Sequence, residues 1–326
     1  MKALVYEGVE TLDIRDVPMP SGRLGDHLIR VMASGICGSD MHAYLGHDDR
    51  RPAPLILGHE AAGVIEDGPQ TGRRVTINPL VTCGTCQACK SGRENLCPER
   101  QIISMPPREG AFAQFVTMPD RNLVTVPDDV PLEKAALTEP LAVSWHAARL
   151  ALDALHPSME RRALVIGGGA IGLAAALALN AMGVEDVTIQ EPNAARRTYL
   201  EERCGQLAVT EFQGMAPLVI DAVGYAATRA AASAATAPGG VIAHVGLGED
   251  MGGLDVRRMT LQEITFIGTY TYTTQDFHDT AQAIFDGRLG TLDWPEQRPL
   301  SEGASAFQDL RTGAVAAPKI ILNPWA

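Results

Sequence analysis

Four of the six cysteines in this chain are crowded into the segment 83–97, where they could hold a metal ion. Their spacing is C-x2-C-x2-C-x7-C, which lets one tight loop present four sulfur ligands to a tetrahedral zinc ion. Because four thiolates leave no position open for water, we expect zinc here to support the fold rather than react. Free buried cysteines and a zinc-ribbon module for nucleic acid are the alternatives. The predicted ligands are Cys83, Cys86, Cys89 and Cys97.

A second set of candidate ligands is spread along the chain, at Cys37, His59, Glu60 and Glu139. Taken singly, each could equally be a core residue. Together they supply a thiolate, an imidazole and carboxylates, which suit a catalytic zinc with one open position. Asp40 could orient His59 through its second ring nitrogen, as carboxylates behind metal-binding histidines commonly do. The sequence leaves open whether Glu60 or Glu139 binds the metal.

A glycine-rich turn in the middle of the chain predicts a dinucleotide site. It follows the short apolar run 163–166 and opens an apolar helix, the context in which G-x-G-x-x-G places a pyrophosphate at a helix N-terminus. Glu191 ends the next predicted strand, VTIQE, where a carboxylate binds the ribose hydroxyls and repels a 2′-phosphate. The expected cofactor is therefore NAD. The glycines of the motif are Gly167, Gly169 and Gly172.

Other side chains near this turn bear on the same cofactor. Ile171 lies inside the motif and Arg196 lies just beyond Glu191, and we expect both to contact the dinucleotide. Arg196 and Arg197 keep NADP open as an alternative, because arginines at this point can accept a phosphate.

These sites must be positioned by two kinds of fold. The first 140 residues contain short apolar runs broken by Gly, Pro and Asp, which predict a strand-rich distorted barrel with a zinc lobe over 78–100. Over 141–274, short buried strands alternate with helical stretches, which predicts an α/β, doubly wound parallel sheet. The tail, 275–326, ends in the apolar run KIILNP and is expected to rejoin the first domain.

The composition of the chain limits the classes of partner that the protein could bind. Hydrophobic residues make up 46% of the 326 residues, which is ordinary for a globular protein. A formal net charge of −12 disfavours nucleic acid and anionic membrane surfaces. The N-terminus, MKALVYEG, has no apolar signal segment, and clustered cysteines suit a reducing compartment, so a cytoplasmic protein is expected.

Several segments together resemble one family, the zinc-containing medium-chain dehydrogenase/reductases. They are GICGSDMH, GHEAAGVI, NPLVTCGTCQACKSGRENLC, GAFAQFVTMPDRNLVTVPD and TEPLAVSWHA, in order through nearly the whole chain. The resemblance is greatest to the polyol branch, which includes sorbitol, threonine and butanediol dehydrogenases. Glu139 stands where classical alcohol dehydrogenases carry a cysteine, and it places the chain in that branch. Gly38 is a departure, because many members have a basic residue there that contacts the cofactor pyrophosphate.

The resemblance implies a GroES-like catalytic domain, a Rossmann domain and two zinc ions per chain. Cys37, His59 and Glu60 would bind the catalytic zinc, and Glu139 would lie at or near it. Ser39 and His42 match positions that relay the alcohol proton through the cofactor ribose to solvent. The expected reaction moves a hydride between NAD and a secondary alcohol, polyol or sugar-derived alcohol.

Two competing functions are also compatible with the sequence. One is a zinc-independent quinone or enone reductase, and the other is a non-catalytic NAD-binding protein.

The resemblance also implies a homodimer or homotetramer. The pair Arg50–Arg51 is either a contact for an acidic or phosphorylated substrate or part of a solvated loop. Cys204 is expected to be a packed residue, and His244 has no assigned role.

Overall fold

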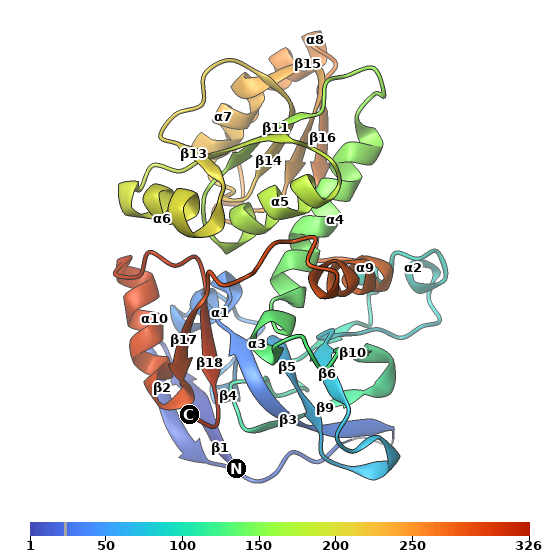
Figure 1. Ribbon diagram of the computed structural model, residues 1–326, viewed down its shortest axis with the longest axis vertical. Helices are drawn as coiled ribbons and strands as arrows, with labels where there is room; N and C mark the ends of the chain where they lie inside the picture. Colours follow the sequence, from blue (N-terminus) through green and yellow to red (C-terminus); the bar gives the residue numbers. More distant parts are fainter. Residues whose placement is uncertain (23–24) are drawn as a thin grey trace. The chain divides into compact units, whose positions relative to one another are not determined.

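Figure 1 shows the computed structural model of the chain, which describes residues 1–22 and 25–326. The chain divides into two compact units, and each is assembled from more than one stretch of sequence. The first unit comprises Met1–Glu139, Thr273–Asp286 and Pro295–Ala326. The second unit comprises Pro140–Tyr272 and Gly287–Trp294.

The segment Gly287–Trp294 differs from the expected return of the entire tail, 275–326, to the first domain, because it groups with the second unit. Both of its ends are held there. The guanidinium carbon of Arg288 lies 5.6 Å from the ring centroid of Trp145, a cation–π distance. The Tyr199 hydroxyl donates a 2.8 Å hydrogen bond to the Trp294 carbonyl. The sequence did not indicate either contact, because neither one produces a periodic pattern of residues.

A seven-stranded sheet forms the centre of the first unit, in the order β10-β6-β5-β3-β18-β17, with β9 paired to β3. Alternate side chains of four of these strands face one core that includes Ile29, Ile65, Ile77 and Met118. This is the predicted strand-rich domain. The strands are β3 (Asp26–Gly35), β5 (Glu60–Ile65), β6 (Arg74–Ile77), β9 (Phe115–Pro119), β10 (Leu123–Thr125), β17 (Glu296–Pro299) and β18 (Ile320–Asn323).

Smaller sheets and short helices complete the first unit. A three-stranded sheet has the order β2-β1-β4, and β7 pairs with β8. These strands are β1 (Lys2–Gly8), β2 (Thr11–Asp16), β4 (Leu55–Ile56), β7 (Leu80–Val81) and β8 (Gln101–Ile102). The α-helices are α1 (Gly38–Tyr44), α2 (Gln87–Lys90), α3 (Leu132–Ala135), α9 (Thr274–Phe285) and α10 (Gly303–Thr312). Single 3₁₀ turns are η1 (Gly68–Gln70), η2 (Glu94–Leu96), η3 (Asp120–Asn122) and η4 (Leu300–Glu302).

The second unit is built on a six-stranded parallel sheet with the order β13-β12-β11-β14-β15-β16. The order reverses between β11 and β14, as in a doubly wound Rossmann sheet, and this confirms the predicted fold class. The strands are β11 (Arg162–Ile166), β12 (Asp186–Gln190), β13 (Leu207–Val209), β14 (Ala216–Asp221), β15 (Thr236–His244) and β16 (Thr265–Gly268).

Helices cover this sheet because its strands carry apolar side chains on both faces. α5 packs on β11 and β12, and α7 packs on β14 and β15. The helices are α5 (Ala170–Ala181), α6 (Ala194–Cys204), α7 (Ala226–Ala235) and α8 (Val256–Leu261), while α4 (Thr138–Ala154) begins in the first unit and continues into the second. None of the helices described combines the length and the apolar character of a membrane-spanning segment.

Candidate functional site

The four clustered cysteines form a compact sulfur cage. The Sγ atom of Cys83 lies 3.9 Å from that of Cys89 and 3.5 Å from that of Cys97, and Cys86 and Cys89 are 3.5 Å apart. Four sulfur atoms bound to one zinc ion at about 2.3 Å would be about 3.8 Å from one another, so the cage fits zinc. Gly84 supports the loop with a φ of 74°.

Backbone amides prepare one of these thiols to bind a metal. The amides of Thr85 and Cys86 donate to the Cys83 Sγ at 3.4 and 3.3 Å. These hydrogen bonds lower the pKa of Cys83 to about 6 in the metal-free cage. Burial and the neighbouring Cys86 thiol raise the pKa of Cys89 to about 11. Zinc must therefore displace protons from some of the four sulfurs when it binds.

The second ligand set also comes together. One ligand atom each from Cys37, His59 and Glu60 lies within 4.8 Å of the other two. Cys37 precedes α1, while His59 and Glu60 lie at the start of β5, which pairs with β3. Glu139 does not belong to this group, although it is buried in the first turn of α4.

Hydrogen bonds fix the orientation of the His59 ring. Its Nδ1 lies 3.3 Å from Oδ1 of the buried Asp40 and 3.4 Å from the Ser104 hydroxyl. Its Nε2 faces the Ser39 hydroxyl at 3.4 Å. Burial lowers the pKa of His59, but the charges of Asp40 and Cys37 raise it more, and the net value lies well above the ordinary one. A metal at Nε2 would thus compete with a proton.

Lys319 is a buried cation in this site that the sequence did not single out. Its Nζ donates to the Glu60 Oε1 at 2.6 Å and to the Ile36 carbonyl at 2.9 Å. The charges of Glu60, Cys37 and Glu139 raise the pKa of Lys319 against the opposite effect of burial. The second carboxylate oxygen of Glu60, Oε2, is buried without a hydrogen-bond partner. A buried anionic oxygen without a partner suits a metal ion.

The structure also shows where three further residues from the sequence analysis lie. His42 is exposed on α1 beside His47, with ring centroids 6.4 Å apart. Arg51 is buried and donates to Asp48 at 2.6 Å and to the Ser104 carbonyl at 3.0 Å. Arg50 pairs with the same aspartate at 2.8 Å. Asp48 therefore pairs with both arginines, and Arg51 also joins this loop to the segment of Ser104.

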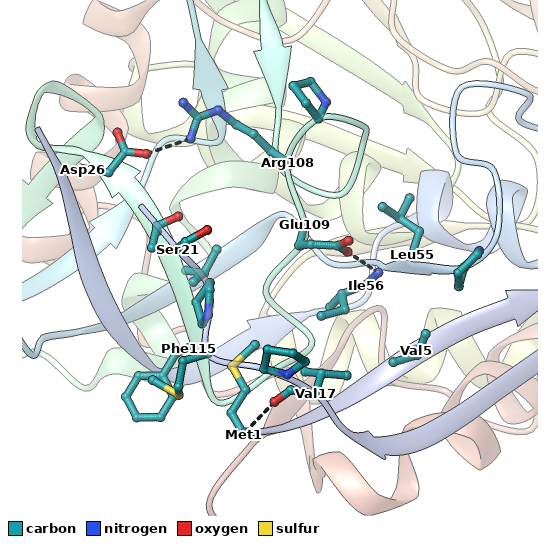
Figure 2. A pocket seen from close by; sticks show the side chains of 18 residues that line it. Met1, Val5, Val17, Ser21, Asp26, Leu55, Ile56, Arg108, Glu109 and Phe115 are labelled. Carbon is teal, nitrogen blue, oxygen red and sulfur yellow. Dashed lines mark hydrogen bonds and ion pairs between the residues drawn. The ribbon is translucent and has the colours of Figure 1, made fainter. Parts of the chain in front are cut away.

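A cavity of about 490 Å³ lies in the first unit (Figure 2). The charged side chains that line it have partners within the protein. Arg108 pairs with Asp26 at 3.3 Å, and Glu109 accepts the Ile56 amide at 2.7 Å. The cavity holds none of the predicted ligands.

The glycine-rich turn of the second unit has the geometry that a dinucleotide site needs. Gly167 has a φ of 97°, and a side chain at Gly172 would collide with the Gly167 carbonyl. Gly169 precedes the first turn of α5, so the free amides of that helix open at the turn. Glu191 is buried beside it, where its carboxylate accepts the amides of Gly168 and Asn193 at 2.9 and 2.8 Å.

Arg196 and Ile171 also lie at this turn. The Nη1 of Arg196 would be 3.8 Å from a side chain at Gly169, and its Nε is buried without a hydrogen-bond partner. The Ile171 carbonyl accepts the Ser144 hydroxyl at 2.8 Å. Arg197 is engaged elsewhere, since its Nη1 donates to the carbonyls of Glu191 and Pro192.

Comparison with known proteins agrees with this geometry. Residues 23–128 match the alcohol dehydrogenase GroES-like domain, and residues 170–286 match the zinc-binding dehydrogenase domain. The chain is 32% identical to sorbitol dehydrogenase of Arabidopsis thaliana over 292 residues, which are 81% of this chain and 79% of that protein. It is 40% identical to sorbitol dehydrogenase of Bacillus subtilis over 200 residues, 59% of this chain and 56% of that protein.

Solved structures give the same result. Alcohol dehydrogenase TADH from Thermus sp. ATN1 is 25% identical and superimposes with a TM-score of 0.88, covering 99% of both chains. Cys37, His59, Glu60 and the four clustered cysteines fall within the first matched region, and the second begins inside the glycine-rich turn. The chain therefore belongs to the zinc-containing medium-chain dehydrogenases, in their polyol dehydrogenase branch.

Proposed function

We propose that this protein is an NAD-dependent dehydrogenase that oxidises a secondary alcohol, polyol or sugar-derived alcohol reversibly to the ketone. One observation carries the proposal. Cys37, His59 and Glu60 bring their ligand atoms within 4.8 Å of one another. Three ligands leave one position for substrate, which distinguishes a catalytic zinc site from the closed four-cysteine cage.

Glu60 is the proposed third ligand, because a carboxylate oxygen of Glu60 lies in this group and Glu139 does not belong to it. The Oε2 atom of Glu60 also lacks a hydrogen-bond partner. Zinc held there would act as a Lewis acid and lower the pKa of a hydroxyl group. Asp40 holds the His59 ring so that Nε2 remains available. Glu139 is buried, and its charge contributes to the raised pKa of Lys319. It would accept a hydrogen bond from a water molecule or hydroxyl group beside the site.

The remaining chemistry assigns roles to other residues of the chain. NAD would accept the hydride from the carbinol carbon, and the hydroxyl proton must leave separately. Ser39 lies 3.4 Å from the His59 Nε2, beside the position a substrate hydroxyl would take, and it receives that proton first. His42 is exposed and can pass the proton to solvent.

The second unit would bind the dinucleotide at its glycine-rich turn. Amides at the start of α5 face the pyrophosphate, and Glu191 favours NAD over NADP by repelling a 2′-phosphate. Arg196 has a buried Nε without a partner at this turn and would supply positive charge that Gly38 does not. The four-cysteine cage would hold a second, structural zinc.

The proposal also covers the cellular compartment of the protein and the assembly of its chains. The described cysteines are all free of disulfides, which suits the cytoplasm. A homodimer or homotetramer formed through the second unit is the proposed assembly.

The test combines metal analysis with a screen of NAD and NADP reduction over polyols, diols and sugar acids. We expect two zinc ions per chain and turnover with NAD. Cys37→Ser and His59→Ala should retain one zinc and NAD binding but lose turnover. Cys204→Ser, outside both ligand sets, is the matched control. Full activity in Cys37→Ser, or the absence of turnover from a fully zinc-loaded enzyme across the screen, would refute the proposal.

A further inference from the structure

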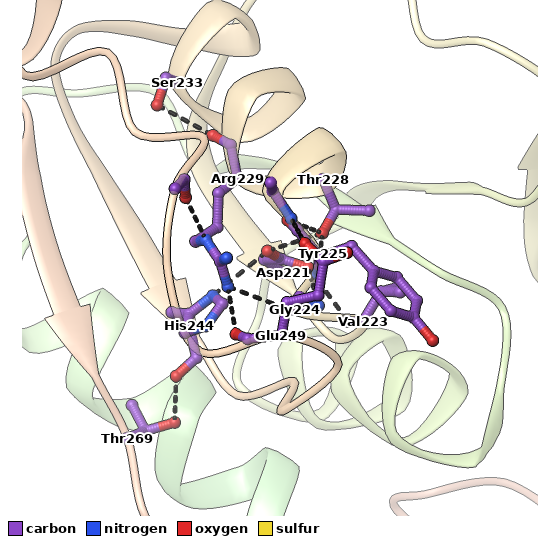
Figure 3. Close-up of polar contacts among 12 residues, drawn as sticks. Asp221, Val223, Gly224, Tyr225, Thr228, Arg229, Ser233, His244, Glu249 and Thr269 are labelled. Atoms are coloured by element: carbon purple, nitrogen blue, oxygen red, sulfur yellow. Dashed lines mark hydrogen bonds and ion pairs between the residues drawn. The ribbon is translucent and has the colours of Figure 1, made fainter.

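A buried arginine in the second unit binds several carbonyls of one loop. Arg229 lies on α7, and its guanidinium donates to the carbonyls of Gly224 at 2.8 Å and Glu249 at 2.9 Å. It also donates to Gly252 at 2.6 Å and Met251 at 2.5 Å. Figure 3 shows Arg229 pointing from its helix toward Gly224 and Glu249. The guanidinium thus donates hydrogen bonds to backbone oxygens in the two segments that follow β14 and β15.

The loop is bound to the helix in the opposite direction as well. The Glu249 carboxylate accepts the amide of Ala226, the first residue of α7, at 2.8 Å. The amide of Gly248 donates to the Val223 carbonyl at 3.2 Å, and the Glu249 amide donates to the Gly224 carbonyl at 2.9 Å. Arg229 therefore joins the helix to the loop and Glu249 joins the loop to the helix, and we call this pair of residues the latch.

Glycines allow the two segments joined by the latch to pack backbone against backbone. A side chain at Gly224 would collide with the backbone of Gly246, and one at Gly246 would collide with that of Val223. A side chain at Gly253 would collide with Ala226. Glycine-rich loops lose much conformational entropy when ordered, so this one needs specific contacts to hold a single conformation.

The latched segments border the crevice of the proposed cofactor site. Sheet order reverses between β11 and β14, and ligands of doubly wound sheets bind outside the carboxyl ends of the strands at that point. A side chain at Gly167, in the glycine-rich turn, would collide with the Val223 side chain. The segment after β14 thus touches the turn predicted to hold the pyrophosphate.

Asp221 fixes the start of the same segment. Its Oδ1 accepts the amides of Val223 and Gly224 at 3.0 Å, and its Oδ2 lies 3.2 Å from the His244 Nδ1 (Figure 3). The segment is therefore held at its first residues by Asp221 and at the Gly224 carbonyl by Arg229.

We propose that Arg229 is a positioning residue for the cofactor. It holds the segments after β14 and β15 together as one rigid edge of the crevice, so that the dinucleotide half lying over β14–β16 meets a pre-formed surface. The proposal rests on the proposed function, since it requires a dinucleotide at this crevice. Pre-organisation of a loop lowers the entropy lost on binding, so removal of Arg229 weakens affinity without removing a cofactor contact.

The test measures binding of NAD and of AMP to the full chain. AMP occupies the half of the site over β11–β13, whereas NAD also requires the latched half. Arg229→Met should raise the Kd for NAD about tenfold and change that for AMP less than about twofold. Arg229→Lys, which retains a cation, should restore part of the loss. The amides of Gly248 and Glu249 should also exchange hydrogen faster in Arg229→Met than in the unaltered protein.

Arg258 provides the matched control in the same unit. It also donates to backbone carbonyls, of Ser233 and Thr236 at 2.8 Å each, but these lie at the other end of α7. Arg258→Met should affect NAD and AMP equally. If Arg229→Met does not fold, Glu249→Ala opens the latch from the exposed side and should give the same selective loss.

The outcomes separate the two proposals. If the unaltered protein binds AMP but no NAD, the proposed cofactor is wrong. If it binds NAD and the latch variants bind NAD equally well, or lose NAD and AMP affinity in parallel, the positioning role of Arg229 is wrong and the proposed function stands.

Discussion

The space that holds the Glu60 carboxylate depends on the residue opposite it. Glu60 and Gly35 are partners across the antiparallel pair of β5 and β3. A side chain at Gly35 would collide with the Glu60 Oε2, the oxygen without a partner. The glycine is therefore needed for the position of a proposed zinc ligand rather than for backbone freedom.

Gly35→Ala should displace Glu60 and lower the zinc content from two ions per chain toward one. The four-cysteine site should keep its metal, because it lies in a separate lobe. Gly38→Ala is the control, since a side chain there meets open space. Zinc per chain, measured before and after dialysis against a weak chelator, gives the result. Equal zinc retention in the two variants would show that Glu60 is not a ligand.

Asp221 gives the second unit a dependence on pH. Burial raises its pKa, but hydrogen bonds from His244 and the amides of Gly224 and Val223 lower it more, so that the pKa lies below the ordinary 3.8. A carboxyl group with a lowered folded-state pKa stabilises the fold above about pH 4. That contribution is lost as the pH falls through the folded-state pKa.

Asp221→Asn should therefore lower the free energy of unfolding by about 2 kcal/mol at pH 7, because a buried charged hydrogen-bond acceptor is lost. The difference from the unaltered protein should shrink below about pH 4. Denaturant unfolding at a series of pH values measures it, with the exposed Asp250→Asn as control. A difference that stays constant with pH would assign the effect to shape rather than to charge.

At the scale of elements, the four-cysteine lobe supports a helix distant in sequence. The Oε1 of Glu94, on η2 between Cys89 and Cys97, accepts the amide of Thr274 at 2.6 Å. Thr274 is the first residue of α9, and its amide is one of those that a helix leaves without an internal partner. The lobe thus caps α9, which makes the zinc cage a support for a second element.

Loss of the structural zinc should therefore loosen the start of α9. Cys97→Ser should reduce the zinc content by one and speed hydrogen exchange in the first turn of α9, but not in α5. Cys204→Ser provides the comparison, because that thiol lies outside the lobe. Unchanged protection of the Thr274 amide in zinc-depleted Cys97→Ser would mean that the lobe holds its shape without metal.

Across the whole molecule, patterns of local origin were predictable, whereas the long-range polar contacts of Lys319 and Arg229 were not. The alternation of strands with Ala-rich helices is built from short local patterns, and the fold class that it indicates is confirmed. The family implied by the resemblance of several segments is confirmed as well. The cluster of Cys37, His59 and Glu60 needed the family resemblance, because only the pairing of β3 with β5 brings these residues together.

Two functional contacts left no trace in the sequence for physical reasons. Lys319 is a single cation at the start of an apolar strand, and nothing near it indicates that its partner is Glu60. Arg229 lies in an Ala-rich helix, where it reads as an ordinary solvated charge, although it is buried against loop carbonyls. Such contacts depend on which elements become neighbours, and periodicity does not encode that choice.

The pairing of Lys319 with Glu60 also sets an order of events during synthesis. The two residues are 259 positions apart, and ribosomes add roughly 5–20 residues per second, so Lys319 is made about 13 to 50 seconds after Glu60. The proposed ligands Cys37, His59 and Glu60 are all complete before that cation exists. A metal ion that reaches the nascent chain in this interval meets a carboxylate with no lysine beside it, whereas later one of the two carboxylate oxygens is already bound by Lys319.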